Sequence, residues 1–511
     1  MMLNSANICI VITILVYLIV VVGIGVACSR RNRTTDDFYL GGRKLGPLVT
    51  AMSAEASDMS SWLLMGLPGV AYLSGVADAG WTAIGLAAGT YLNWLIVARR
   101  IRLYTHRVGA ITIPEFFSKR FGDERRILTG IAAVVILIFF IPYTASGFAA
   151  CGKLFNSLFG IDYVGAMVVS GIIIVAYTTL GGFLAASTTD FIQSIVMTIA
   201  LFVMVLFGIR AAGGLDVVMD NARALPGYLS MTLSHDMAAN AANPYGFITI
   251  VSTLAWGLGY FGMPHILLRF MAIEDERKLK LSRRVASIWV VISMAVAIFI
   301  GIVGYGVTKA GGIGFLEGSA SETVIVRLAG LLSTYGIPAA LLAGVVLAGI
   351  LASTMSTSDS QLLAAASSVS QNLMSECFQV KMNEKKKVTA ARLTVVGIAL
   401  IAMFMARNPN SSVFGIVSFA WAGFGAAFGP VVLFGLFWKR TNWQGALAGM
   451  VSGGVMIFVW KYLVRPLGGV WNIYELLPAF LVACVFIVAV SLATTAPKQE
   501  IVDTFNDVKA L

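Results

Sequence analysis

Two carboxylates and four hydroxyls stand close together in residues 53–69, a stretch that is otherwise apolar. The carboxylates are Glu55 and Asp58, and the stretch closes with Gly66-Leu67-Pro68-Gly69, which disfavours a continuous helix. A membrane-spanning helix must satisfy its own backbone, so such residues at that depth indicate a functional interruption. Unwound backbone there can turn carbonyls toward a cation and amides toward an anion. The hydroxyls belong to Ser53, Ser57, Ser60 and Ser61.

A second polar cluster is the hydroxyl-rich run 353–360, STMSTSDS, inside another apolar stretch. A hard monovalent cation prefers several neutral oxygens, and Ser356 and Thr357 could supply two hydroxyls opposite the interruption at 53–69. Sodium fits this set better than a transition metal, because histidine and cysteine ligands are missing from it. The alternative is that these hydroxyls bond back to carbonyls of their own helix or to a neighbouring helix.

A second interruption is expected at 256–264, WGLGYFGMP, where three glycines weaken the helix. Trp256, Tyr260 and Pro264 are four residues apart, so in an α-helix they lie near one face and could form an aromatic wall beside a cavity. The alternative is simple packing of aromatic rings against glycines where two helices cross.

Several apolar stretches contain acids but no bases. Lys and Arg are absent from 45–98, 162–209, 224–268 and 328–380 among others, whereas Glu55, Asp58, Asp190 and Asp359 lie within such intervals. Unpaired acids in a low-dielectric interior are costly, so this asymmetry favours a pathway for cations. For Asp190, which ends Ser-Thr-Thr-Asp, a role as a helix cap is the competing interpretation.

The composition places these clusters in a polytopic membrane protein. Hydrophobic residues make up 58% of the 511 residues, charged residues only 12%, and the mean hydropathy is +0.86. The five cysteines show no CxxC spacing, which argues against a metal cluster or disulfide framework. Thirteen runs are long enough to span a bilayer, near 7–28, 46–74, 79–98, 127–152, 162–180, 189–211, 247–272, 285–307, 337–374, 390–408, 414–438, 444–465 and 473–493.

The net charge of +11 is a signal of topology. The first run, 7–28, has no basic residue before it and is followed by Arg30, Arg31 and Arg33, so we expect a retained span with its N-terminus outside. With that orientation, 28 of the 36 Lys and Arg residues fall on the inner side, as the positive-inside rule requires. Residues 212–246 then form a long outer loop, and 320–334 an amphipathic outer helix.

Residues 337–374 are too long for an upright span, so this helix must tilt or project into the cytoplasm. The second interrupted span, 247–272, comes five spans after the first, 46–74. That spacing is expected if two inverted repeats each open with a broken helix.

With these motifs in view, the chain is identified as a member of the solute:sodium symporter family. The matching segments extend over most of the sequence. They are DFYLGGR at 37–43, ASDMS…WLLMGLPG at 56–69, Tyr143 in FFIPYTASG, FLAAS at 183–187, WGLGYFG.PHI at 256–266, MST at 355–357, WAGFGAAFGPVVLF at 421–434 and GALAGM at 445–450.

The resemblance implies an all-α polytopic protein of the cell membrane with a leucine-transporter-type core of five plus five inverted spans. It implies a secondary active transporter that couples inward sodium movement to uptake of L-proline by alternating access, with membrane lipid around it and no enzymatic activity. The implied divisions of this single domain are 7–28 as a peripheral span, 46–211 and 247–438 as the repeats, 444–493 as two peripheral spans and 494–511 as a cytoplasmic tail.

Two sets of site residues follow from the resemblance alone. The implied sodium ligands are the carbonyls of Ala56, Met59 and Ser353 and the hydroxyls of Ser356 and Thr357, with Asp58 supporting sodium affinity and Asp190 on the inward path. The implied substrate pocket is lined by Ser60, Trp62, Tyr143, Trp256, Tyr260 and Pro264.

Five positions depart from the proline-carrying members that the chain resembles. Glu55 and Ser61 replace glycines, Met263 replaces glutamine, Ser353 replaces alanine, and Asp359 is an additional acid. Our hypothesis is that Glu55 binds or relays a cation; a protonated or hydrated carboxyl is the alternative.

Other functions fit the sequence less well than transport of proline. An intramembrane enzyme lacks support, because there is no HExxH motif and the three histidines are dispersed. A channel fits the broken helices and their aromatic faces less well than an occludable site does, and the C-terminal tail is expected to be too short for the signalling domain of a sensor. The main alternative is the same fold carrying another amino acid, a monocarboxylate or a vitamin, with ion coupling altered by Glu55 and Asp359.

Overall fold

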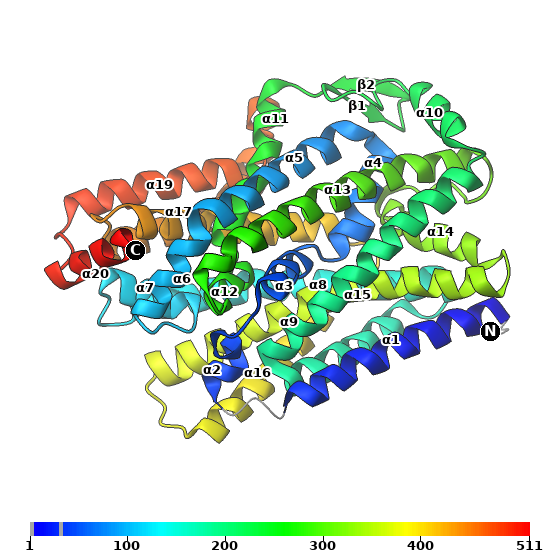
Figure 1. Ribbon diagram of the computed structural model, residues 1–511. Helices are drawn as coiled ribbons and strands as arrows, with labels where there is room; N and C mark the ends of the chain where they lie inside the picture. Colours follow the sequence, from blue (N-terminus) through cyan, green and yellow to red (C-terminus); the bar gives the residue numbers. More distant parts are fainter. Residues whose placement is uncertain (1–4, 30–33) are drawn as a thin grey trace.

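The computed structural model describes residues 5–29 and 34–511, and almost all of its regular structure is helical. The long helices run side by side in one bundle (Figure 1). Arg30, Arg31 and Arg33, on which part of the predicted topology rests, lie outside the described residues. The α-helices are α1 (Ser5–Ser29), α2 (Thr35–Leu40), α3 (Pro47–Asp58), α4 (Leu67–Ser74), α5 (Val76–Leu92), α6 (Ala98–Arg107), α7 (Ile113–Phe121), α8 (Ile127–Phe159), α9 (Tyr163–Ala211), α10 (Leu215–Arg223), α11 (Phe247–Leu254), α12 (Pro264–Ala272), α13 (Leu279–Lys309), α14 (Val324–Ser333), α15 (Ile337–Ser367), α16 (Glu384–Met405), α17 (Val413–Phe437), α18 (Trp443–Val459), α19 (Leu476–Ala493) and α20 (Gln499–Ala510).

Tighter or wider helical turns extend or join several of these helices. The 3-10 helices are η1 (Gly41–Arg43), η4 (Ala255–Gly262), η5 (Glu276–Lys278), η6 (Gly318–Thr323), η9 (Arg465–Leu467) and η10 (Gly469–Trp471). The π-helical segments are η2 (Trp62–Gly66), η3 (Asn93–Val97), η7 (Ser368–Cys377) and η8 (Trp460–Val464).

Among the described residues, ten helices are long and apolar enough to cross a membrane, or eleven if one bent pair counts as a span. The sequence predicted thirteen. Two features account for the difference: α9 covers both 162–180 and 189–211 as one kinked helix, and the predicted span 46–74 is divided into the short helices α3 and α4. The predicted number is therefore compatible with the structure.

Both predicted interruptions are present. After α3 the chain leaves the helical conformation at Met59, where ψ is 71°, and resumes with η2 and α4. In the second span, η4 follows α11, Met263 is extended, and α12 starts at Pro264 with a bend of 47° between the two halves. Proline suits the first helical turn because its missing N–H has no partner there in any case.

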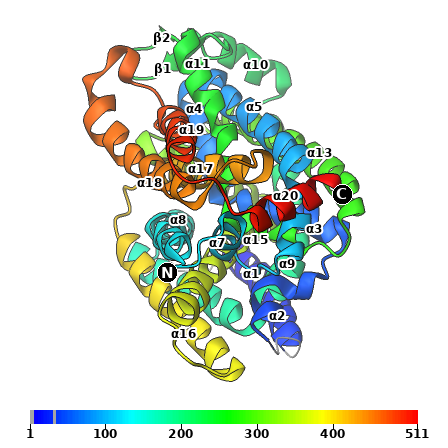
Figure 2. The same cartoon turned by 90° about the vertical axis from the view of Figure 1, so that its left-hand side faces the viewer.

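The segments predicted to lie on opposite sides of the membrane lie at opposite ends of the bundle. Figure 1 shows α6, α7 and α20 toward one end and α10, α14 and the start of α1 toward the other. Figure 2, viewed onto the first of these ends, shows α20 lying across the neighbouring helices. The predicted outer helix 320–334 corresponds to α14 with the preceding turn η6.

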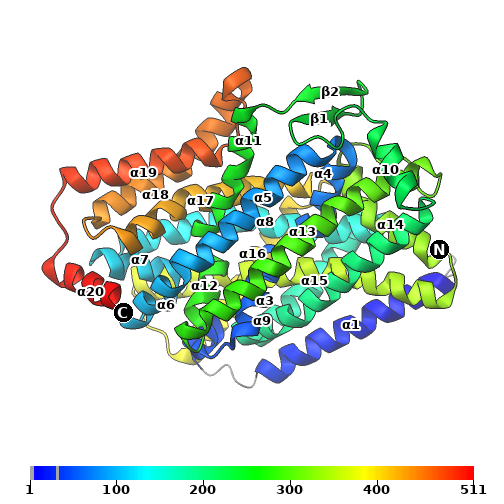
Figure 3. The ribbon, with the colours of Figure 1, turned by 45° about the horizontal axis from the view of Figure 1, so that its top comes forward.

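The predicted long loop 212–246 is not entirely irregular. It contains α10 and an antiparallel hairpin of β1 (Leu233–Asp236) and β2 (Ala241–Pro244), in which Leu233 pairs with Pro244. The hairpin is placed over α4 and α5 (Figure 3). Val76 donates its backbone N–H to Tyr228 O at 2.9 Å, and the Trp81 indole donates to Met231 O at 2.7 Å, so the loop is fixed to the start of α5.

Helix α9 forms the centre of the packing, against α15, α1, α8 and α3. It bends at Gly182, where φ is 62° and ψ is −163°. This conformation is open to glycine and essentially closed to other residues, because a Cβ atom would collide with the backbone.

Replacing Gly182 by alanine should therefore destabilise the protein by about 1–3 kcal/mol. The matched control is Gly397→Ala in α16, where an added Cβ meets nothing within 4 Å and helix propensity improves. The melting temperature of the purified protein in detergent should fall for Gly182→Ala and not for Gly397→Ala. Equal melting temperatures for the two variants would show that an alanine at position 182 adopts the bend without strain.

Candidate functional site

The break after α3 lies against the hydroxyl-rich part of α15. The Ser356 hydroxyl donates to the carbonyl of Ala56 at 2.7 Å, which joins the two predicted halves of the cation site. The Ser353 carbonyl accepts from Ser356 Oγ at 3.1 Å and from Thr357 Oγ1 at 3.2 Å. Four of the five predicted sodium ligands are thus brought into one hydrogen-bonded group.

The fifth predicted ligand, Met59, is the first residue after α3 and is fully buried. The competing interpretation of the hydroxyl run also holds in part. Thr354, Thr357 and Ser360 bond back to carbonyls of their own helix, as hydroxyls in membrane helices commonly do. Ser356 differs because it also reaches across to the broken span.

Three of the six predicted substrate residues, Trp62, Tyr143 and Tyr260, form hydrogen bonds with Asp58. Its carbonyl accepts from the Trp62 indole at 3.0 Å and from the Tyr143 hydroxyl at 3.4 Å. Its carboxylate accepts from the Tyr260 hydroxyl at 2.5 Å. Three aromatic side chains from three separate segments therefore surround the last residue of α3, beside Ser60.

The structure corrects the prediction that Trp256, Tyr260 and Pro264 share one face. Residues 255–262 form a 3-10 helix, which has three residues per turn, so a spacing of four residues rotates the side chain away. The Trp256 ring instead stacks on Tyr474 with centroids 5.0 Å apart, while Tyr260 points toward Asp58. Pro264 begins α12.

All six predicted substrate residues are buried, and the aromatic side chains among them are at most 6% exposed. The chain is closed around this group. The second broken span is also held in place by α17. The Trp421 indole of α17 donates to Trp256 O at 2.7 Å, and the Trp421 ring lies edge-on to Tyr260.

The structure contradicts the prediction that Asp190 has no basic partner. Arg269, near the end of α12, forms an ion pair with Asp190 at 3.2 Å, and both side chains are almost fully buried. Asp190 lies in the middle of α9, so it caps no helix. Arg269 was missed because it stands at the margin of its apolar run, although a lone basic residue in HILLRFMA was a visible signal.

Arg269 connects four segments. It donates to Ser53 of α3 at 3.0 Å, to the His265 carbonyl of its own helix at 2.9 Å and to Ser360 of α15 at 2.5 Å, besides the ion pair with α9. Ser53 also donates to Asp190 at 2.7 Å. The predicted sodium site is therefore closed toward the α12 end of the bundle by a buried polar network.

The two additional acids have partners from helices that the sequence did not connect to them. Asp359 accepts from the Tyr177 hydroxyl of α9 and from Ser360 Oγ at 3.0 Å. Glu55 accepts from Thr90 at 3.0 Å and from the Trp94 indole at 2.8 Å, both on the α5–η3 segment. Neither forms an ion pair within the described chain.

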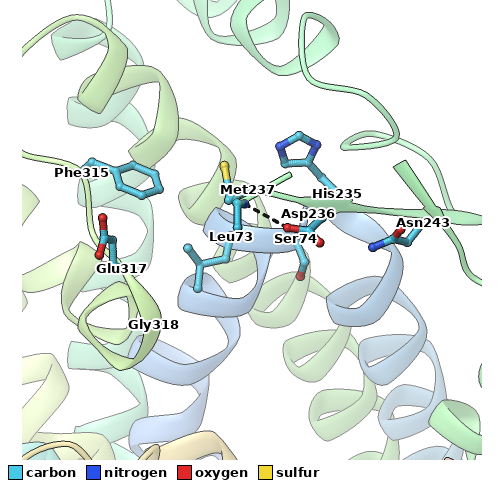
Figure 4. A pocket seen from close by; sticks show the side chains of 10 residues that line it. Leu73, Ser74, His235, Asp236, Met237, Asn243, Phe315, Glu317 and Gly318 are labelled. Atoms are coloured by element: carbon cyan, nitrogen blue, oxygen red, sulfur yellow. Dashed lines mark hydrogen bonds between the residues drawn. The ribbon is translucent and has the colours of Figure 1, made fainter. Parts of the chain in front are cut away.

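A separate cavity of about 660 Å³ opens at the hairpin end of the bundle (Figure 4). It lies between the end of α4, the β1–β2 hairpin and the segment before η6, and none of the predicted site residues lines it. Its carboxylate at Asp236 is held by backbone N–H groups of Ala239 and Ala238, which lower the pKa of Asp236. This cavity is distinct from the buried group around Asp58.

Comparison with known proteins adds three observations. The model of the sodium:solute symporter family matches residues 38–453. The sodium/proline symporter of Haemophilus influenzae is 41% identical over 97% of this chain and 96% of the relative, and the high-affinity proline transporter of Bacillus subtilis is 40% identical over 95% and 98%. The solved structure of a sodium-coupled sialic acid symporter in a substrate-bound outward-open state has a TM-score of 0.78, with 17% identity, over 96% of this chain and 99% of that one.

Removing the Arg269 side chain leaves Asp190 as a buried, uncompensated charge, which costs about 3–5 kcal/mol. Arg269→Gln should therefore lower the melting temperature of the purified protein strongly, and adding Asp190→Asn should recover part of the loss. Arg223→Gln is the control, because the pair of Arg223 and Asp220 is exposed and worth at most about 1 kcal/mol. An Arg269→Gln protein as stable as the Arg223→Gln protein would contradict the proposed importance of the buried pair.

Proposed function

The chain belongs to the sodium:solute symporter family, and on that premise we propose that it couples the inward movement of sodium to the uptake of L-proline by alternating access. It has a leucine-transporter-type fold and spans the membrane many times. The observation that carries the proposal is the 2.7 Å hydrogen bond from the Ser356 hydroxyl to the Ala56 carbonyl. It brings together the broken span and α15, the two segments that supply the proposed sodium ligands.

The proposed sodium ligands are the carbonyls of Ala56, Met59 and Ser353 and the hydroxyls of Ser356 and Thr357. This is an all-oxygen set of neutral groups, which suits a hard monovalent ion. The two hydroxyls now donate to Ala56 O and Ser353 O, and on sodium binding they would turn their lone pairs toward the ion. Asp58 adds one negative charge nearby without having to contact the ion.

The proposed proline pocket is formed by the aromatic residues around Asp58 and the open backbone of the break. Proline is an apolar ring with a secondary ammonium and a carboxylate. Rings such as Tyr143 and Trp62 can cover its apolar face and attract its ammonium, while amides at the start of η2 can bind its carboxylate. Trp256, packed on Tyr474, would then act at the rim of this pocket.

Alternating access requires that each end can open in turn. Toward the α12 end, the network of Arg269 with Asp190, Ser53 and Ser360 closes the path, so we propose that this network separates when sodium leaves past Asp190. Toward the α14 end, Lys153 of α8 pairs with Glu322 of η6 at 2.8 Å. Both contacts are buried, which is consistent with a state closed at both ends.

We propose the orientation that the charge distribution predicts, with the N-terminus outside and the C-terminal helix α20 in the cytoplasm. Sodium then enters from the α14 end and leaves at the α12 end. With a membrane potential that is negative inside, each charge that moves inward through 100 mV contributes about 2.3 kcal/mol. We also keep the proposed division into repeats 46–211 and 247–438, each opening with one of the two broken spans.

The first test is uptake of radiolabelled L-proline into proteoliposomes of the purified protein. An inward sodium gradient should drive accumulation, whereas an equal potassium gradient or a proton gradient alone should not. Sodium-dependent uptake of another amino acid or a carboxylate, with none of proline, would overturn the substrate and direct attention to Ser61 and Met263. Uptake without any sodium dependence would overturn the coupling.

The second test concerns the sodium ligands. Ser356→Ala should raise the half-saturating sodium concentration about tenfold or more, because a hydrogen-bonding partner of a charge is worth about 1.5–3 kcal/mol. Ser367→Ala is the matched control, since this buried serine of α15 bonds only to Ala364 of its own helix. If both variants keep the sodium dependence of the unmodified protein, Ser356 is not a ligand.

A further inference from the structure

The carboxyl group of Glu55 is buried on the side of α3 that faces α5 and η3, and the Glu55 side chain is 1% exposed. One carboxyl oxygen accepts hydrogen bonds from Thr90 at 3.0 Å and from the Trp94 indole at 2.8 Å. The other oxygen, Oε2, has no hydrogen-bond partner among the residues that the structure describes. A buried carboxylate oxygen without a partner is costly, so this position calls for a ligand.

Two more buried oxygens without partners belong to the same cluster, Asp58 Oδ1 and Asn93 Oδ1. Glu55 and Asp58 are three residues apart on α3 and so share one face. Asn93 lies next to Trp94, and its amide nitrogen donates to Tyr260 O at 3.0 Å. The Tyr260 hydroxyl in turn donates to the other oxygen of Asp58, so Tyr260 connects Asn93 and Asp58, two of the three residues that carry the unpaired oxygens.

Among the described residues, no basic side chain pairs with the two carboxyls. Tyr260 on η4 and Tyr143 on α8 are the ionisable groups that contact Asp58 from outside α3, and α5–η3 presents Thr90, Asn93 and Trp94. On α12, Arg269 is engaged with Asp190 and Ser360 toward α9 and α15. Within the part of the chain that the structure describes, neither Glu55 nor Asp58 takes part in an ion pair.

A proton on Glu55 does not satisfy this geometry. Oε1 already receives two donors, so the acid proton would sit on Oε2, from which it can reach at most one of the other two unpaired oxygens. At least one buried acceptor would then still lack a partner. A metal cation can instead accept lone pairs from several oxygens at once.

We propose that Glu55 Oε2, Asp58 Oδ1 and Asn93 Oδ1 bind a second sodium ion, between α3, the α5–η3 segment and η4. The site lies on the opposite side of α3 from the proposed sodium site at α15, which uses main-chain and hydroxyl oxygens. Two sodium ions then balance the two carboxylates. The inference deepens the proposed function, because it sets the number of ions that accompany each substrate molecule.

The test is a measurement of the charge that moves with each proline in proteoliposomes, obtained from the membrane voltage at which net flux reverses. Two charges per proline are expected for the unmodified protein and one for Glu55→Gln and Glu55→Gly. Glu376→Gln is the control, because this buried acid of η7 contacts Gln371, Asn372 and Arg126 instead of α3 and should leave the ratio at two. A ratio of one in the unmodified protein, or of two in Glu55→Gln, overturns the second site.

Two further measurements distinguish a second sodium ion from a proton, and failure of the second site from failure of the proposed substrate. If the second charge follows an imposed proton gradient and persists without a sodium gradient, the second ion is a proton and the proposal fails. Binding of ²²Na⁺ to the purified protein requires no substrate, and it should show two ions per chain, and one after Asn93→Ala or Glu55→Gln. Binding of one ion per chain in the unmodified protein overturns the second sodium site, whether or not the protein carries proline. Binding of two ions without any proline uptake overturns only the proposed substrate.

Discussion

The structure depends on how the broken end of α3 is satisfied inside the protein. A helix that stops at membrane depth exposes polar backbone that no water can pair, so other side chains must do so. Here Trp62 and Tyr143 donate to the Asp58 carbonyl and Tyr260 donates to its carboxylate. Because these donors come from η2, α8 and η4, closing the break also gathers the helices that form the site.

The two sides of α3 meet different chemistry. Toward α9, α12 and α15 lie Ser53, the pair of Arg269 with Asp190, and the hydroxyl of Ser356. Toward α5 and η4 lie neutral donors and acidic oxygens without a base. A movement of α3 therefore changes both environments together, which is how ion binding on this helix can be coupled to the opening of either end.

The architecture tolerates large changes in sequence. The sialic acid symporter shares 17% of its residues with this chain yet aligns with a TM-score of 0.78. In this chain the two broken spans lie against the long helices α15 and α17, whose side chains donate hydrogen bonds to Ala56 O and Trp256 O. The buried carboxyl of Glu55, on the other side of α3, is held by Thr90 and Trp94.

The sequence by itself determined the membrane class and the two interruptions, because hydropathy and helix-breaking residues act locally. The association of residues 53–69 with 353–360 was expected from the resemblance to the symporter family, and the hydrogen bond from Ser356 to the Ala56 carbonyl agrees with it. It could not determine that Arg269 pairs with Asp190, since 79 residues separate them and only the packing of α12 and α9 against α3 brings them together. It also misjudged the face of Trp256, because the spacing assumes an α-helix and the packing against α17 enforces a 3-10 turn. Partners across helices are set by tertiary packing, which no local pattern encodes.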